Sequence, residues 1–210
     1  MVKIGIINIG IGNTKGAYNA IKYIGHDVNL VDKKEIKDYS HIIFPGVGNF
    51  QAGTKALTPE WREEIKNFIK KGDFFMGICL GMQLLFNKSE ESEGEGLGII
   101  KGEIKSIQSI CKTKITLPRL GWKLVNYDQE YQGKLGAPGQ KSKYYFVHSY
   151  ALLPDFHEKQ NDEFIVEQVE DGYRVAASIE KNNIIGVQYH PEKSSMFGLE
   201  ILNNFVNLKS

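Results

Sequence analysis

The stretch from Asp73 to Phe86 restricts the possible folds of this chain most strongly, because its residue pattern changes from strand-like to helix-like halfway along. Its first residues form a short apolar run typical of a β-strand, and its last residues place Leu and Met at helical spacing. Residues 77–81, Gly-Ile-Cys-Leu-Gly, therefore lie at a strand-to-helix junction. The two glycines permit a tight turn that exposes the residue between them at the carboxyl edge of a sheet.

Before this junction, strand-like and helix-like segments alternate. Residues 2–9 form a continuous apolar run with one lysine, which is typical of a strand buried on both faces of a parallel sheet. An apolar helix face follows and ends at Gly25, and another helix begins after the capping residue Thr58 and an early proline. Further strands are predicted at 27–31 and 41–44. This alternation predicts an α/β fold with a flavodoxin-like, doubly wound, mostly parallel central sheet and helices on both faces.

The second half of the chain reads differently. Residues 89–96 are acidic and contain glycine, which is typical of a solvated loop, and residues 126–143 lack periodicity and are predicted to be a loop. A last helix is predicted over 198–208. Short strand-like runs separated by turns predict an antiparallel extension, and they lie at residues 99–107, 114–117, 144–148, 164–169, 173–179 and 184–189.

Length and charge limit the classes of function. The chain has 210 residues, which suits one domain over 1–210. Its 26 basic and 25 acidic residues leave a net charge of +1, so neither nucleic acid nor a membrane is expected as a partner. The start lacks the pattern of a signal peptide, and no run approaches the roughly 20 apolar residues of a membrane span. We therefore expect a cytoplasmic protein. The glycine turn after residue 9 lacks both nucleotide-binding fingerprints, and no cofactor is expected.

The chain has two cysteines, Cys79 and Cys111, without metal-ligand spacing, so no metal is expected. Cys111 lies in apolar surroundings and is interpreted as a small buried hydrophobe. Cys79 stands between the two junction glycines, and a helix that begins directly behind it favours the thiolate over the thiol. We therefore interpret Cys79 as a nucleophile.

A thiolate nucleophile needs a base and a group that orients the base. Of five histidines, His26 and His41 are expected at the surface or a sheet edge and His157 in a polar loop, whereas His148 and His190 each end a strand-like run. Pro191 stiffens the chain after His190, and Glu192 follows, so imidazole and carboxylate can project from one turn. A strand-end histidine beside a solvated glutamate is the competing interpretation.

Together, the cysteine junction and the His-Pro-Glu segment resemble the Cys-His-Glu triad of class I glutamine amidotransferases. Residues 45–48, Pro-Gly-Val-Gly, are similar to the oxyanion strand of that family, and residues 186–194 to its His-Glu signature. Within the class, residues 120–122, 145–150 and 191–194 are most similar to the glutaminase subunits of imidazole glycerol phosphate synthases, which form ammonia for histidine biosynthesis.

The resemblance implies hydrolysis of glutamine to glutamate and ammonia. Cys79 would attack the carboxamide, His190 would carry the proton, and Glu192 would orient the imidazole. The oxyanion would bind backbone N–H groups of Leu80 and of Val47, the latter after a peptide rotation at Gly46.

The resemblance also implies further contacts. Residues around the glutamine substrate would be Gly48, Gln83, Glu91, Ser149 and Tyr150, with a solvated surface carboxylate as the equal alternative for Glu91. A (β/α)₈-barrel synthase subunit would form a heterodimer with this chain and receive the ammonia. Asn13, Trp122 and Lys193 would lie at that contact, although Lys193 could be an ordinary surface lysine.

Three features depart from the family pattern. Arg119 and Lys123 flank the Gly-Trp pair, the 126–143 loop is long, and residues 171–174 replace a Tyr-Gly-aromatic pattern. These changes lie on the expected partner side and leave the glutaminase chemistry intact, but they leave open a paralogue that feeds a related barrel synthase in bacterial surface-sugar biosynthesis. A non-catalytic scaffold with the same fold is a separate alternative, against which the retained Cys79, His190 and Glu192 argue.

Overall fold

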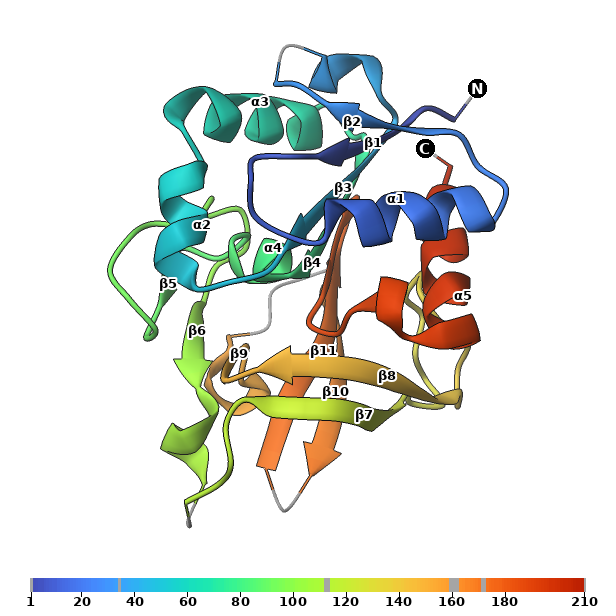
Figure 1. Ribbon diagram of the computed structural model, residues 1–210. Helices are drawn as coiled ribbons and strands as arrows, with labels where there is room; N and C mark the ends of the chain where they lie inside the picture. The colour runs from blue at the N-terminus through green and yellow to red at the C-terminus, as the bar shows by residue number, and fades with distance from the viewer. Residues whose placement is uncertain (1, 34, 112–113, 159–162, 171–172, 210) are drawn as a thin grey trace.

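The computed structural model describes residues 2–33, 35–111, 114–158, 163–170 and 173–209. Within them, the largest sheet has the strand order β10-β11-β12-β4-β3-β1-β2 (Figure 1). The parallel strands are β2 (Val28–Val31), β1 (Ile4–Ile7), β3 (His41–Gly46), β4 (Phe74–Cys79) and β12 (Ile184–Val187). Their order is the flavodoxin-like one. The antiparallel strands β11 (Tyr173–Lys181) and β10 (Glu163–Glu170) extend it. The predicted fold class is confirmed.

Helices cover both faces of this sheet. On one face, α1 (Thr14–Tyr23) and α5 (Ser195–Val206) share a buried apolar cluster with Ile6 of β1. On the other face, α3 (Pro59–Lys70) and α2 (Phe50–Ala56) pack in a second cluster that contains Ile7. Successive strand residues point to opposite faces, so burial on both faces explains why β1 is a continuous apolar run.

Side chains fix the starts of three helices. The Asn13 side chain accepts a hydrogen bond from Gly16 N in α1, and the Asn49 side chain accepts one from Ala52 N in α2. The predicted cap Thr58 accepts one from Trp61 N at 3.4 Å in α3. These caps satisfy backbone N–H groups that lack a partner inside the helix.

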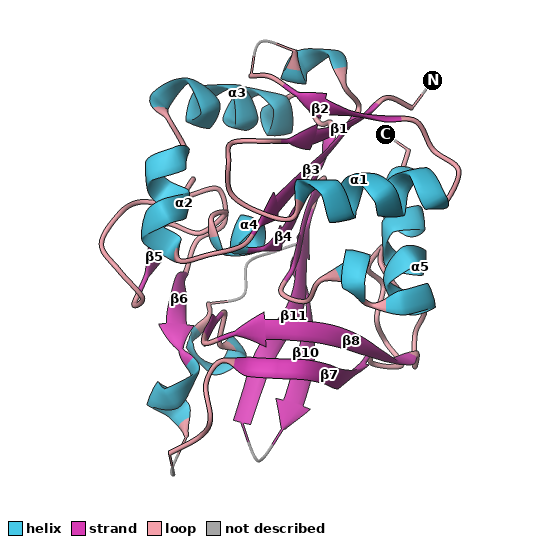
Figure 2. Cartoon of the chain, in the orientation of Figure 1, coloured by secondary structure: helices cyan, strands magenta, loops and turns pink. Residues whose placement is uncertain are grey.

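A separate hairpin lies below the parallel strands of the central sheet and crosses β10 and β11 in the view of Figure 2. It pairs β7 (Arg119–Asn126) with β8 (Lys141–His148). Short strands β5 (Lys88–Ser89), β6 (Glu103–Ser106) and β9 (Tyr150–Ala151) form a third group, and single-turn 3₁₀ helices complete the fold at Ile36–Asp38 (η1), Ile107–Ile110 (η2), Pro154–Phe156 (η3) and Pro191–Lys193 (η4).

The hairpin corrects one strand prediction. Residues 114–117 were expected to form a strand, but they are irregular, and the strand begins two residues later at Arg119. Ile115 N donates to the Gln108 side chain rather than to a neighbouring strand. Residues 171–172 of the atypical 171–174 segment lie outside the described residues, and the antiparallel character of this half is confirmed.

The stretch between β7 and β8 is a loop, as predicted, but its interior side is anchored. Tyr131 and Leu135 are buried in the core. The Tyr131 hydroxyl donates to the buried Glu180 carboxylate, which also accepts from Lys134 N at 2.6 Å. Burial raises the pKa of Glu180, against the hydrogen bonds from Tyr131 and Lys134. Among the described residues, no helix has the length and apolar character needed to cross a membrane.

Candidate active site

Cys79 is the last residue of β4 and has φ 55° and ψ −110°. A non-glycine residue is strained in this region, and such strain is typical of a nucleophile on a sharp turn. Gly81 is needed behind it, because a β-carbon there would collide with the backbone oxygen of Phe44 in β3. The helix that follows, α4 (Leu80–Gln83), is only one turn long. The expected junction is present, but the dipole behind the sulfur is that of four residues rather than of a full helix.

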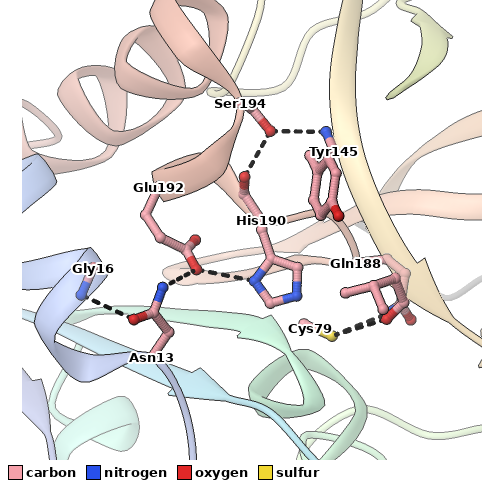
Figure 3. A network of polar contacts seen from close by, with 9 residues as sticks. Asn13, Gly16, Cys79, Tyr145, Gln188, His190, Glu192 and Ser194 are labelled. Carbon is pink, nitrogen blue, oxygen red and sulfur yellow. Dashed lines mark hydrogen bonds and ion pairs between the residues drawn. The ribbon is translucent and has the colours of Figure 1, made fainter. Parts of the chain in front are cut away.

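His190 follows β12 and is held by its backbone. Its N–H donates to Tyr145 O at 2.9 Å, and its carbonyl accepts from Ser194 Oγ at 2.6 Å. Ser194 Oγ in turn accepts from Tyr145 N at 2.9 Å, so this hydroxyl ties the turn after His190 to β8 (Figure 3). The imidazole therefore projects from a position fixed on two sides.

Glu192 lies on the turn η4 and contacts the imidazole. Its Oε1 accepts from His190 Nδ1 at 3.0 Å and from Asn13 Nδ2 at 3.2 Å (Figure 3). Both the His190 and the Glu192 side chains are 1% exposed. With Nδ1 donating to the carboxylate, Nε2 remains for proton transfer, and it has no hydrogen-bond partner among the described residues.

The charge state of His190 follows from its neighbours. Burial disfavours the imidazolium, but Cys79 and Glu192 outweigh it and raise the pKa of His190 to about 9. A cationic imidazole beside the sulfur is therefore favoured at neutral pH. Such a pair can hold a thiolate and return a proton to a leaving group.

The predicted oxyanion residues lie in the two segments next to Cys79. Gly46, at the end of β3, is the register partner of Cys79, and a β-carbon there would lie 2.6 Å from Gly81 N. Val47 follows and is 46% exposed. Leu80 is the first residue of α4, so its N–H has no partner inside the helix. The end of β3 therefore lies directly beside the nucleophile and the start of α4.

The residues expected around the substrate differ in their burial and in their hydrogen-bond partners. Gly48 has φ 122° in the loop after β3. Ser149 and Tyr150 are half-buried, and the Ser149 carbonyl accepts from Ile107 N. Gln83 is buried, and its Nε2 donates to Tyr150 O and to Gln188 Oε1, both at 3.0 Å.

Glu91 is not a solvated surface carboxylate. It is half-buried, and its Oε2 accepts from Phe50 N at 2.7 Å. Phe50 is the first residue of α2, so the carboxylate satisfies a helix N-terminus directly after the Pro-Gly-Val-Gly loop. The acidic segment is thereby tied to the loop that carries the expected oxyanion donor.

The three residues expected at a partner contact divide into two groups. The Asn13 side chain is turned inward to Glu192. Trp122 is 50% exposed and stacks edge-on against Tyr145, with ring centroids 6.1 Å apart. Lys193 is exposed, with its Nζ 5.9 Å from the same tyrosine ring. Trp122 and Lys193 therefore share an exposed patch around Tyr145.

Other assignments from the sequence need correction. His41 is 2% exposed and packs against Phe74, so it is not a surface residue. His157 lies in the expected loop, but its side chain is buried and pairs with Glu163 at 2.9 Å. Cys111 is half-buried rather than buried. The apolar packing of His41 was not readable from its polar neighbours in the sequence.

Two buried polar residues that contact the site were missed: Gln188 contacts the sulfur, and Ser194 contacts the backbone of His190. Gln188 and Ser194 are fully buried, and both lie in the segment around His190. Their partners are distant in the chain: Ser194 contacts Tyr145 N in β8, and Gln188 contacts Cys79 at the end of β4, so the sequence did not indicate a side-chain role for either.

Known proteins are similar to this chain over its full length. The family described as "Glutamine amidotransferase class-I" matches residues 5–208. The protein named imidazole glycerol phosphate synthase subunit HisH of Caldanaerobacter subterraneus subsp. tengcongensis is 41% identical, covering 96% of each chain. The protein of the same name from Helicobacter hepaticus is 35% identical, covering 99% of each. A solved structure titled as a glutamine amidotransferase shares the fold, with a TM-score of 0.72 and 14% identity over 97% of this chain and 96% of that one.

Proposed function

This chain belongs to the class I glutamine amidotransferase family, and from that premise we propose that it is the glutaminase subunit of an imidazole glycerol phosphate synthase. It hydrolyses glutamine to glutamate and ammonia for histidine biosynthesis. The observation that carries the proposal is the buried Glu192–His190 pair at 3.0 Å beside a strained Cys79. Residues 1–210 form one domain of this family.

The reaction proceeds by nucleophilic catalysis. The Cys79 thiolate attacks the side-chain carbonyl carbon of glutamine and forms a C–S bond, and the carbonyl oxygen takes the electron pair. His190 then gives its Nε2 proton to the leaving nitrogen as the C–N bond breaks, which releases ammonia. Water attacks the thioester, with His190 accepting its proton, and glutamate leaves as the thiolate reforms. Glu192 holds the imidazole tautomer and stabilises its cation throughout.

The oxyanion of each tetrahedral intermediate is stabilised by backbone N–H groups of Leu80 and Val47. Their placement around Cys79 supports this role, and each such donor typically contributes about 3 kcal/mol of barrier lowering. Glycine at position 46 leaves the peptide between Gly46 and Val47 free to turn the Val47 N–H toward the oxyanion. Gly48, Gln83, Glu91, Ser149 and Tyr150 surround the glutamine or hold the segments that do.

The acceptor of the ammonia is a second subunit, a (β/α)₈-barrel synthase in a cytoplasmic heterodimer. The names of both relatives describe a subunit, which supports a two-chain enzyme. The exposed patch of Trp122 and Lys193 around Tyr145 suits a docking face, and Asn13 connects that side to Glu192. The same names favour the histidine pathway over the surface-sugar alternative as the destination of the nitrogen.

The test is glutamate formation from glutamine by the full chain, alone and with its synthase partner, with the Cys79→Ala variant as control. We expect glutamate in the presence of the partner and none from the variant. Folded, docked protein that forms no glutamate would support the scaffold alternative. Co-purification from native cells identifies the partner, and recovery of a sugar-modifying synthase would overturn the histidine assignment.

A further inference from the structure

Gln188 makes the sulfur contact that remains unexplained by the triad. It lies one residue beyond the end of β12 and is fully buried. Its Nε2 donates to Cys79 Sγ at 3.7 Å, which lies within the range for a hydrogen bond to sulfur. We propose that Gln188 positions the Cys79 sulfur and stabilises its thiolate, and that Gln83 orients the Gln188 amide for this task.

The direction of this hydrogen-bond chain is set by a backbone carbonyl. Tyr150 O can only accept, and it accepts from His148 Nδ1 and Gln83 Nε2, each at 3.0 Å. Gln83 must therefore present its NH₂ group on that side, and the second hydrogen of this group points to Gln188 Oε1 at 3.0 Å. Once its oxygen is used in this way, Gln188 can present only N–H groups to the sulfur.

The contact suits a thiolate better than a thiol. As a thiol, Cys79 has an acceptor for its S–H, because Val147 O lies 3.9 Å from the sulfur. Loss of the proton leaves a negative charge that this carbonyl cannot stabilise, whereas the Gln188 N–H can. Hydrogen bonds to charged groups are roughly twice as strong as neutral ones. The pair Gln83–Gln188 is buried, so water does not compete for these groups.

Among the described residues, few other groups lie close enough to the sulfur to affect its charge. Within this part of the chain, the titratable side chains next to it are His190 and, behind the imidazole, Glu192. The elements β3 and α4 contribute Gly46 and Leu80 beside it, and β8 contributes the Val147 carbonyl. A change at Gln188 therefore acts on the thiolate–imidazolium pair directly.

The test measures alkylation of Cys79 by iodoacetamide as a function of pH, in the full chain carrying Cys111→Ser so that one thiol reports. Gln188→Met keeps the volume and removes the N–H donor. We expect the midpoint of the pH profile to rise by about one unit and alkylation at pH 7 to slow by about tenfold. Gln188→Glu, which places a carboxylate near the thiolate, should raise the midpoint further. The matched control is Gln129→Met, on the exposed loop between β7 and β8.

A profile of Gln188→Met that superimposes on that of the parent overturns the proposal. If Gln188→Met does not fold, as judged by circular dichroism, Gln83→Met replaces it, because this variant removes the orienting donor without touching the sulfur. It should raise the midpoint in the same direction by a smaller amount, and an unchanged midpoint refutes the orienting role.

A role in substrate binding gives a different result. With Cys79→Ser as background, Gln188→Met should leave the Kd for glutamine within about twofold, measured by calorimetry, whereas about tenfold weaker binding would assign Gln188 to the substrate and overturn the proposal. This inference concerns the site of the proposed function, but alkylation needs no glutamine turnover. A chain that alkylates as expected and forms no glutamate would therefore refute the function and leave the sulfur contact intact.

Discussion

Replacement of Glu192 by Gln removes one charge from the site and keeps its shape. The amide oxygen can still accept from His190 Nδ1, so the imidazole should stay in place. The pKa of His190, about 9 against an ordinary 6.5, corresponds to about 3 kcal/mol in favour of the cation at 1.36 kcal/mol per unit. Burial lowers the pKa of His190, whereas Cys79 and Glu192 raise it, so loss of the Glu192 charge should remove about half or more of the upward shift.

The sign of the pH dependence follows from the raised pKa. A histidine whose pKa is higher in the folded than in the unfolded state contributes its full stabilisation below pH 6.5 and loses it as the pH rises towards about 9. The free energy of unfolding of the parent should therefore fall by about 3 kcal/mol between these pH values from this group. In Glu192→Gln the fall should be about half as large or less.

The assay is urea unfolding at pH 6.5 and pH 9, with Glu63→Gln on the exposed side of α3 as the control for a lost surface charge. Glutamine hydrolysis by the partner-bound enzyme is measured in parallel, and kcat should fall by about 100-fold or more, because an uncharged partner no longer stabilises the imidazolium. Equal pH dependence in parent and variant, with kcat within about threefold, would refute the assignment of Glu192 to the His190 charge.

Two further variants test the support of His190 and the docking patch. Ser194→Ala removes the hydrogen bond to the His190 carbonyl and leaves Tyr145 N without its acceptor, so the free energy of unfolding should fall by about 2 kcal/mol. The value of kcat should fall as well, because the turn that carries His190 loses its tie to β8. Urea unfolding and glutamate release measure the two effects, and an unchanged kcat in a destabilised protein would limit Ser194 to a structural role. Lys193→Ala should weaken the stimulation of glutaminase activity by the synthase partner while folding stays intact, because Lys193 is exposed beside Tyr145, and full stimulation would exclude Lys193 from docking.

The sequence predicts the buried parallel strands well, because a strand covered on both faces must be apolar at every position, as β1 and β4 are. It fails for β7, where Leu120, Trp122 and Leu124 face outward. Exposed apolar residues and a glycine disrupt the inside–outside alternation by which a half-buried strand is found. The alternation of strands and helices in the first half predicts the central sheet, whereas β7 is recognised as a strand only through its pairing with β8.

The same distinction holds for the site. Cys79, His190 and Glu192 carry chemical side chains in recognisable local frames, so they could be proposed from the residues themselves. Gln188 was not assigned, and Glu91 was expected near the substrate by resemblance alone, since their partners lie 109 and 41 residues away in the chain. An amide or carboxylate has a role only through what it contacts, and spacing along a sequence does not give these contacts.

The strand β8 and the two residues after it connect the exposed patch to the chemistry. Its outer face carries Tyr145, between Trp122 and Lys193. Backbone carbonyls from the same segment accept from His190 N, from Cys79 Sγ and from Gln83 Nε2, and they belong to residues 145, 147 and 150. Hydrogen bonds weaken steeply with distance and angle. A partner that displaced this strand by a fraction of an ångström would therefore alter the base, the nucleophile and the orienting amides together, so docking and thiolate activation share one structural element.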